Sequence, residues 1–289
     1  MKSIALFFTF IAPFALCSAI KARQATQAKT IKVFLLAGQS NCGGAGNGDQ
    51  LPADLKKTDK EVLLFSKGHK NELTLLAPYN RVEEKFHIEH TAFGPELVFG
   101  KEMKKAFPND VVLIVKQSTG GTSIVAWDKN WKRADWKSDM KLAKNEKKEP
   151  YYGLVLSMAK EGVAQAKAKF PGARVEYCGM LWVQSERDDT DVKLAKDYEK
   201  NLRALIQNYR TDLGAPDLPF LFAGSNVRLY ADIIMNGMKK VAQEVPNTAL
   251  ILVNDLPKHE GIHYNTEGQM KLGKRFADAY LEIIKKEGK

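Results

Sequence analysis

The sequence predicts an α/β protein with a mostly parallel sheet covered by helices on both faces, a three-layer α/β/α sandwich. Five apolar runs rich in β-branched residues alternate with longer stretches whose apolar residues recur at three- and four-residue spacing. This alternation is typical of parallel sheets, because each return to the same edge needs a crossover, usually a helix. The five predicted strands are 31–37, 111–115, 175–183, 220–223 and 249–253.

The predicted helices follow these strands, and the first of them carries Pro95 at its start, a position that proline favours. Segment 49–90 is less regular, with a short strand candidate at 62–65, and we expect it to pass over the face that carries the site. No internal repeat and no domain-scale linker interrupt the chain. We therefore expect one domain over 31–289, with helices at 94–106, 152–170, 194–210, 231–245 and 266–286.

The N-terminus has the charged, apolar and small-residue order of a secretory signal. Lys2 is followed by an apolar run over 4–16 and then by Cys17, Ser18 and Ala19. The sequence thus predicts a signal peptide over 1–19, a polar segment over 20–30, and export to the periplasm or the medium. Lipid attachment at Cys17 is the less favoured alternative, because the bulky Leu16 precedes it. No second long apolar segment follows, so we expect no membrane span.

The formal net charge is +10, and part of the excess lies in a lysine-rich segment over 129–150. Nothing in the chain resembles a nucleic-acid-binding module, so no nucleic-acid partner is expected. Without the signal, Cys42 and Cys178 remain, too few and too far apart for a disulfide framework. We expect both to be small buried hydrophobic residues, and we expect no metal and no cofactor.

The stretch AGQSNCGGAG after the first predicted strand contains Ser40. It is not a P-loop, because no Gly-Lys-Ser/Thr follows, and it is not a GxSxG elbow, because Cys42 stands at the second glycine. A plain turn is one interpretation. A nucleophile is the other, since the loop lies at the sheet edge where sites form, but a serine hydroxyl needs a base within hydrogen-bond reach.

The C-terminal region offers that base. His263 lies after the fifth predicted strand, and Glu260, three residues earlier, can hold one ring nitrogen and leave the other free. His259 competes with His263 for the role of base, and Asp255 competes with Glu260.

Two further loops contain groups suited to acyl transfer. Gly120 and Gly121 follow the second strand and can point backbone N–H groups at an oxyanion. Gln184 follows the third strand and can add a side-chain amide donor.

The blocks AGQSN, GGT…W, LW.Q.E.D and HYNTEGQMKLGKRFA, with FGPELVFGKEM between them, resemble successive blocks of SGNH-type carbohydrate O-acetylesterases. The resemblance is to the branch of family-six acetylxylan esterases and the sialate O-acetylesterase domain. It implies a flavodoxin-like fold and metal-free ester hydrolysis. The implied roles are catalysis by Ser40, His263 and Glu260, an oxyanion hole of Ser40, Gly120 or Gly121, and Gln184, and substrate binding by Gln39, Asn41, Trp127 and Glu186.

Three positions depart from the family pattern. Cys42 replaces a methionine, Ser185 replaces a glycine, and Glu260 stands where aspartate is commoner. The sequence thus predicts an exported serine esterase that removes acetyl groups from a carbohydrate. A carbohydrate-binding protein without turnover and an SGNH lipase or thioesterase are the alternatives.

The lysine-rich segment 129–150 generates a prediction about substrate charge. If its lysines and its Trp131 and Trp136 gather an anionic glycan, KM on an acetylated acidic polysaccharide should rise several-fold with salt, because exposed charges are screened beyond about 8 Å at physiological salt. Turnover of a small neutral acetyl ester, measured in the same buffers, should stay constant. Equal salt dependence on both substrates would favour the alternative, a merely solvated loop.

Overall fold

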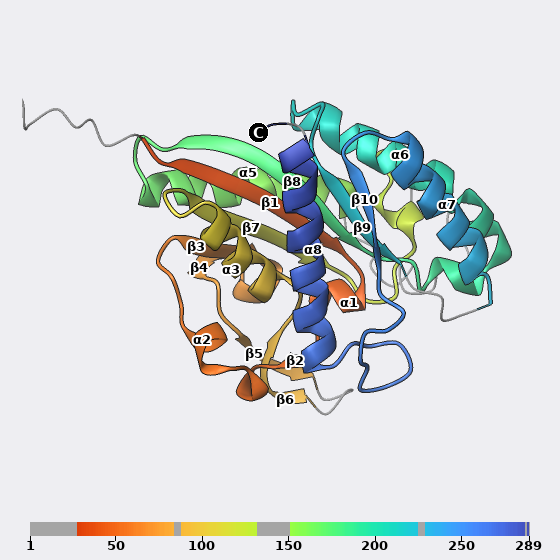
Figure 1. Cartoon of the computed structure of the whole chain (residues 1–289), viewed down its shortest axis with the longest axis horizontal. Helices are drawn as coiled ribbons and strands as arrows, with labels where there is room; N and C mark the ends of the chain where they lie inside the picture. The colour runs from red at the N-terminus through yellow and green to blue at the C-terminus, as the bar shows by residue number, and fades with distance from the viewer. Residues whose placement is uncertain (1–27, 84–87, 132–150, 225–228, 287, 289) are drawn as a thin grey trace, which may run out of the picture.

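Figure 1 shows a computed structural model in which a twisted central sheet lies between helical layers. The structure describes residues 28–83, 88–131, 151–224, 229–286 and 288. The predicted signal peptide and most of the lysine-rich segment, 132–150, lie outside the described residues. Within the described ranges, no helix has the length and apolar character needed to cross a membrane.

The central sheet has seven strands in the order β10-β9-β8-β1-β7-β3-β4. The predicted α/β/α class is confirmed, but the prediction of five strands is wrong, because segment 49–90 supplies two more. The strands are β1 (Thr30–Gly38), β3 (Val62–Ser66), β4 (Glu72–Leu75), β7 (Val111–Ser118), β8 (Arg174–Val183), β9 (Phe220–Gly224) and β10 (Thr248–Leu252).

Strand β3 is the short candidate at 62–65, and every residue in it is buried. It pairs in parallel with β7, with Leu64 opposite Ile114, so it belongs to the core. Strand β4 pairs antiparallel with β3 at the sheet edge, and its partly exposed pattern gives no strong strand signal. The remainder of the segment forms a second antiparallel sheet in the order β2-β6-β5, with β2 (Gly46–Asn47), β5 (Tyr79–Glu83) and β6 (Ile88–Phe93).

The helices cover both faces of the large sheet. Successive side chains of β1 alternate between two buried clusters: Val33 and Leu35 belong to one, and Phe34 and Leu36 to the other. The first cluster packs against α5 (Tyr151–Lys169), α6 (Val192–Asp212) and α7 (Ala231–Glu244), and the second against α3 (Glu96–Ala106) and α8 (Thr266–Lys286). The short helices are α1 (Ser40–Gly43) and α2 (Ala53–Lys56).

The two predicted buried cysteines are confirmed as such. Cys42 and Cys178 are free thiols, and their side chains are 0% and 4% exposed. Burial raises the pKa of the Cys42 thiol to about 12, so it stays protonated and packs as a small apolar side chain.

Three strands at the centre of the sheet end at one level. Strand β1 pairs in parallel with β7 and with β8, and Gly38 stands opposite Ser118 on one side and Val183 on the other. The chain leaves β1 toward β7 and β3 and later crosses to β8, β9 and β10 on its other side. Such a change of direction leaves a crevice beyond the carboxyl ends of the strands, which is where open α/β sheets bind ligands.

Gly38 allows β1 to stop at this edge. Its φ is +145°, and an added Cβ would lie 2.0 Å from the carbonyl oxygen of Val183. The Val183 carbonyl is held this close to Gly38 because it accepts a hydrogen bond of 2.9 Å from the N–H of the next residue, Gln39. Only a residue without a side chain fits there.

Replacing Gly38 by alanine should therefore lower the free energy of unfolding by about 2–4 kcal/mol, since overpacking and an unfavourable φ add. Urea unfolding followed by circular dichroism measures this change. Gly153→Ala is the matched control: it lies in α5, an added Cβ meets nothing within 4 Å, and the helix should gain up to about 1 kcal/mol. A Gly38→Ala protein as stable as the parent would contradict the argument.

Candidate active site

Ser40 lies at the carboxyl end of β1, as the first residue of the short helix α1. Its side chain is partly exposed, whereas its neighbours Gln39 and Asn41 are buried at 2% and 1% exposure. The sharp turn at Gly38 thus brings one hydroxyl to the surface between two interior side chains.

His263 reaches this hydroxyl from the other end of the sequence. Its Nε2 lies 2.9 Å from the Oγ of Ser40, and its Nδ1 contacts Oε1 of Glu260. The ring is 16% exposed and the Glu260 side chain 48% exposed. The hydrogen bond to His263 lowers the pKa of Glu260, which favours a carboxylate facing the ring. The Ser40 hydroxyl, the His263 imidazole and the Glu260 carboxylate therefore form a chain of two successive contacts.

The competing residues take other partners. Asp255 pairs with Arg275 at 2.6 Å, and this ion pair lowers the pKa of Asp255 to about 2. Its carboxylate is therefore engaged away from the histidine ring. The ring of His259 stacks beside that of His263, with 6.0 Å between centroids, while the contact to Ser40 comes from His263.

The side chain of Asn41 ties the serine turn to the histidine loop. Its Nδ2 donates to the carbonyl of Ile262 at 2.9 Å, and its Oδ1 accepts from the N–H of Tyr264 at 3.1 Å. These two residues flank His263 on either side. The same Nδ2 donates to the buried carboxylate of Glu186 at 2.7 Å, a short charge-assisted bond. The position of His263 relative to Ser40 is thus fixed through the neighbour of the serine.

A buried ion pair holds the end of α1, the short helix that begins with Ser40. Lys116 on β7 lies 2.7 Å from Glu96 at the start of α3, and their side chains are 5% and 2% exposed. Lys116 also donates to the carbonyl of Gly43 at 2.8 Å, and Glu96 accepts from the N–H of Gly94 at 2.9 Å. The pair joins the end of α1 to the loop before α3, and each charge has hydrogen-bonded partners that offset the cost of its burial.

Gly120 lies next to the serine, as the sequence predicts for an oxyanion loop. An added Cβ on Gly120 would be 3.7 Å from the Cβ of Ser40, and the residue is exposed. Gly121 follows with a φ of +67°, which glycine adopts easily. In the described part of the chain, neither the N–H of Ser40 nor that of Gly120 pairs with a protein acceptor. Both groups are available to a bound oxygen.

Gln184 occupies a different place from the one predicted. Its side chain is 0% exposed, and its Nε2 donates to the carbonyl of Thr122 at 2.9 Å and to the carboxylate of Asp188. Because these acceptors use both amide hydrogens, the predicted oxyanion donor has no N–H to offer. The side chain instead joins the loop after β7 to the loop after β8.

Asp188 is the centre of that junction. It also accepts from the hydroxyl of Ser123 at 2.6 Å and from the N–H of Ile124 at 3.1 Å. Burial raises its pKa to about 6, against the lowering effect of these hydrogen bonds. The carboxylate holds the loop that carries Gly120 in place against β8.

The four predicted substrate-binding side chains lie in the interior. Gln39, Asn41 and Glu186 are at most 5% exposed. Trp127 is 0% exposed, packs edge-on against Trp182 at 5.0 Å and donates to the hydroxyl of Thr122 at 3.2 Å. Its ring presents no free face to a sugar, so the structure assigns Trp127 to the core and the other three to the support of the serine turn.

Ser185, which stands where the family pattern has glycine, is 1% exposed. Its N–H donates to Glu186 at 3.1 Å, and its carbonyl accepts from the N–H of Asp188 at 2.9 Å. The extra hydroxymethyl group is therefore enclosed by the protein and is not part of an exposed binding surface.

Sequence reasoning considered His259 only as a rival base and missed the pattern that it begins. The order His259-Glu260-x-x-His263 has the HExxH spacing of two histidines four residues apart around a glutamate. The structure brings donor atoms of these three residues within 4.8 Å of one another. The spacing was the available signal, and it runs against the expectation of no metal site.

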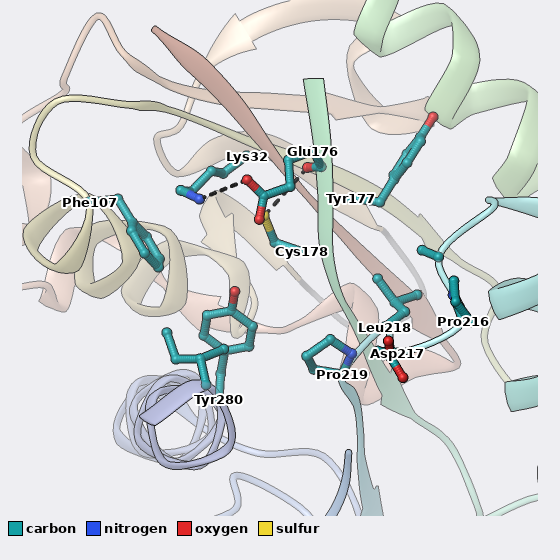
Figure 2. A pocket seen from close by; sticks show the side chains of 12 residues that line it. Lys32, Phe107, Glu176, Tyr177, Cys178, Pro216, Asp217, Leu218, Pro219 and Tyr280 are labelled. Atoms are coloured by element: carbon teal, nitrogen blue, oxygen red, sulfur yellow. Dashed lines mark hydrogen bonds and ion pairs between the residues drawn. The ribbon is translucent and has the colours of Figure 1, made fainter. Parts of the chain in front are cut away.

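A separate cavity of about 360 Å³ lies at the opposite edge of the sheet. Figure 2 shows its lining, in which the Lys32–Glu176 ion pair of 3.1 Å lies near Cys178, Phe107 and Tyr280. Lys32 belongs to β1 and Glu176 to β8, both near the amino ends of their strands, whereas Ser40 follows the carboxyl end of β1. The cavity therefore takes no part in the Ser40 site.

Comparisons with known proteins agree with this architecture. Residues 30–282 match the family described as carbohydrate esterase, sialic acid-specific acetylesterase. A probable carbohydrate esterase of Arabidopsis thaliana is 25% identical over 262 residues, which is 86% of this chain and 90% of that protein. The X-ray structure of that Arabidopsis protein has a TM-score of 0.63 at 23% identity, over 88% of this chain and 98% of the other. A carbohydrate acetylesterase from Xanthomonas citri has a TM-score of 0.55 at 21% identity, over 87% and 56%.

The chain shares the α/β/α fold of these two solved structures, with the candidate site in the loops beyond the carboxyl ends of the parallel strands. The chain belongs to the carbohydrate esterase family of sialic acid-specific acetylesterases. It is accordingly a carboxylic ester hydrolase.

Asn41→Ala tests whether the serine turn positions the histidine. The change leaves the buried groups of Ile262, Tyr264 and Glu186 without their partner, and each such group costs about 1–3 kcal/mol. Stability should fall by about 2–4 kcal/mol, and kcat on a chromogenic acetyl ester should fall at least tenfold, because His263 loses its alignment.

Asn265→Ala is the matched control for this prediction. The Asn265 side chain accepts from the N–H of Gly268 at 2.9 Å and caps α8 without touching the serine turn. Its loss should cost about 0.5–2 kcal/mol of stability and leave kcat near the parent value. Equal kcat losses in the two variants would refute a positioning role for Asn41.

Proposed function

We propose that this esterase removes O-acetyl groups from a carbohydrate in two steps through an acetyl-enzyme on Ser40. The observation that carries the proposal is the 2.9 Å contact between Ser40 Oγ and His263 Nε2, with Glu260 on the other ring nitrogen. Nucleophile, base and orienting carboxylate in hydrogen-bond reach form the arrangement that activates a serine hydroxyl.

In the first step, Ser40 Oγ attacks the acetyl carbonyl carbon while its proton passes to Nε2 of His263. Collapse of the tetrahedral intermediate returns that proton to the departing sugar oxygen and leaves the acetyl group on Ser40. In the second step, His263 takes a proton from water as the water oxygen attacks the acetyl-enzyme. Collapse of that intermediate returns the proton to Ser40 Oγ and releases acetic acid, which ionises to acetate. Glu260 keeps Nδ1 protonated and stabilises the imidazolium formed in each step.

In the tetrahedral intermediate, the carbonyl oxygen of the acetyl ester becomes negatively charged. Hydrogen-bond donors that contact this oxygen more closely in the intermediate than in the ester stabilise the charge. The N–H groups of Ser40 and Gly120 are suited to this task, because both lie beside the hydroxyl and neither serves a protein acceptor in the described ranges. The N–H of Gly121 is the further candidate. Gln184 acts behind these donors by holding Thr122 and Asp188.

The carbohydrate class rests on the family and its relatives. The family description names a sialic acid-specific acetylesterase, and the Xanthomonas citri structure is named a carbohydrate acetylesterase. We extend that class to this chain, with an acetylated sialic acid or polysaccharide as substrate and with an acidic glycan as the form that the lysine-rich segment would favour. Export through the segment 1–19 is part of the proposal, and N-terminal sequencing of protein from the producing cell would test it.

Ser40→Ala and His263→Ala should each reduce kcat on a chromogenic acetyl ester by several orders of magnitude. The double variant should be little slower than either single one, because a nucleophile and its base act as a unit. His259→Ala, assayed in metal-free buffer, is the neighbouring histidine for comparison. Near-parental turnover in His263→Ala together with a collapse in His259→Ala would reverse the assignment of the base.

Substrate class is tested on the intact protein with acetyl and octanoyl esters of one chromophore and with acetylated polysaccharides. Acetyl ester hydrolysis with released acetate from a glycan supports the proposal. Faster hydrolysis of the octanoyl ester indicates a lipase instead. Glycan binding without any product indicates a binding protein.

A further inference from the structure

The loop that carries His263 also assembles three metal-ligating side chains. His259, Glu260 and His263 offer two imidazoles and one carboxylate, and their donor atoms lie within 4.8 Å of one another. Imidazole nitrogen with carboxylate oxygen is a donor set that suits Zn²⁺, which binds such atoms at about 2.0–2.2 Å. His259 and Glu260 are exposed, so their side chains have room to rotate toward an ion held by the partly buried His263.

The loop is held in this form by backbone bonds. Lys258 and Tyr264 form an antiparallel bridge, and the N–H of His259 donates to the carbonyl of His263 at 3.1 Å. The two rings consequently stack with 6.0 Å between centroids and 18° between planes. Asn41 fixes the far side of the loop at Ile262 and Tyr264. Most of the ordering that a metal would otherwise impose is therefore already present.

The arrangement differs from that of an HExxH helix, where the two histidines bind the metal and the glutamate works as a base. Residues 259–263 form a bent loop outside any helix, and the Glu260 carboxylate lies at Nδ1 of His263. The glutamate is thus in reach of a metal on that nitrogen and serves as a ligand.

We propose that His259, Glu260 and His263 form a Zn²⁺ site, and that zinc bound there switches the esterase off. The binding stands on the geometry alone, whereas the inhibition rests on the proposed function.

The inhibition follows from the two nitrogens of His263. As a base, the neutral ring carries its one proton on Nδ1, toward Glu260, and keeps a lone pair on Nε2, toward Ser40. Zinc that binds Nδ1 and the Glu260 carboxylate needs the lone pair of Nδ1, so it selects the tautomer in which the ring's one proton lies on Nε2. The ring remains neutral and loses no proton, but Nε2 has become a donor and no longer accepts the proton of Ser40.

The neighbouring histidine contributes a ligand that is ready to bind. The exposed ring of His259 lies beside that of His263, with 6.0 Å between centroids, so an ion can reach both rings from solvent. Mg²⁺ and Ca²⁺ prefer all-oxygen sites, and one carboxylate does not make one. Selectivity for zinc over these ions is therefore expected.

Zinc binding is measured first, on full-length Ser40→Ala protein, so that turnover has no part in the result. Competition with a chromogenic zinc chelator should give one Zn²⁺ per chain. Adding His259→Ala or Glu260→Gln should weaken binding at least tenfold. The control is His69→Ala in the same background. His69 is a histidine outside the proposed site, and it contacts Ser66. Its loss should leave zinc binding unchanged. Zinc binding that is absent, or equally strong without His259, would overturn the site.

Inhibition is measured next, on the otherwise unaltered protein with a small acetyl ester after chelator treatment. Saturating Zn²⁺ should lower turnover at least tenfold, equimolar Mg²⁺ should have no effect, and chelator should restore activity. His259→Ala, referred to its own zinc-free rate, should need at least tenfold more Zn²⁺ for the same inhibition. Equal sensitivity of the two proteins would refute the switch. Zinc binding by a protein with no esterase activity would refute the proposed function and the switch together, and would leave the metal site standing.

Discussion

The hydrogen bonds of one amide, that of Asn41, hold the candidate site together. Two of them run to Ile262 and Tyr264, the backbone neighbours of His263, and a third runs to Glu186 in the loop after β8. Since Asn41 directly follows Ser40, the hydroxyl and the imidazole share one short rigid connection. The position of the histidine depends on this amide together with the backbone bonds of its own loop.

Behind the amide lie two buried charged clusters that fix the remaining loops. The Lys116–Glu96 pair holds the turn after Ser40, and the Asp188 carboxylate joins the loops after β7 and β8. Both clusters are nearly inaccessible to water, where hydrogen bonds are strong and a missing partner is costly. The polar interior thus gives the exposed groups a fixed geometry that apolar packing alone does not specify.

The sequence predicted those strands and site residues that are marked by a local or periodic pattern of apolar residues. The apolar runs of β1, β7 and β9 were recognisable because nearly all of their residues are buried, and those of β8 and β10 because they are apolar even where they are partly exposed. Ser40 and His263 were recognisable by their places after such runs. Strand β4 was not predicted from the sequence, because it is short and partly exposed at the sheet edge. The roles of Gln184 and Trp127 depend on partners far away in sequence, Asp188 among them, and no local pattern reveals which way a buried amide or indole points. His259 was considered as a base, but its metal-ligand spacing to Glu260 and His263 was missed although the sequence shows it.

The contact between Ser40 and His263 joins residues that are 223 positions apart. A ribosome delivers the serine turn long before the histidine loop, and α8 must pack before Gln269, at 3.4 Å, can donate to the carbonyl of Asn41. A nascent chain that stops before the histidine loop therefore carries Ser40 without its imidazole partner. Under the proposed mechanism, such a chain is inert, because the hydroxyl has no base until the histidine loop and α8 have been made and packed.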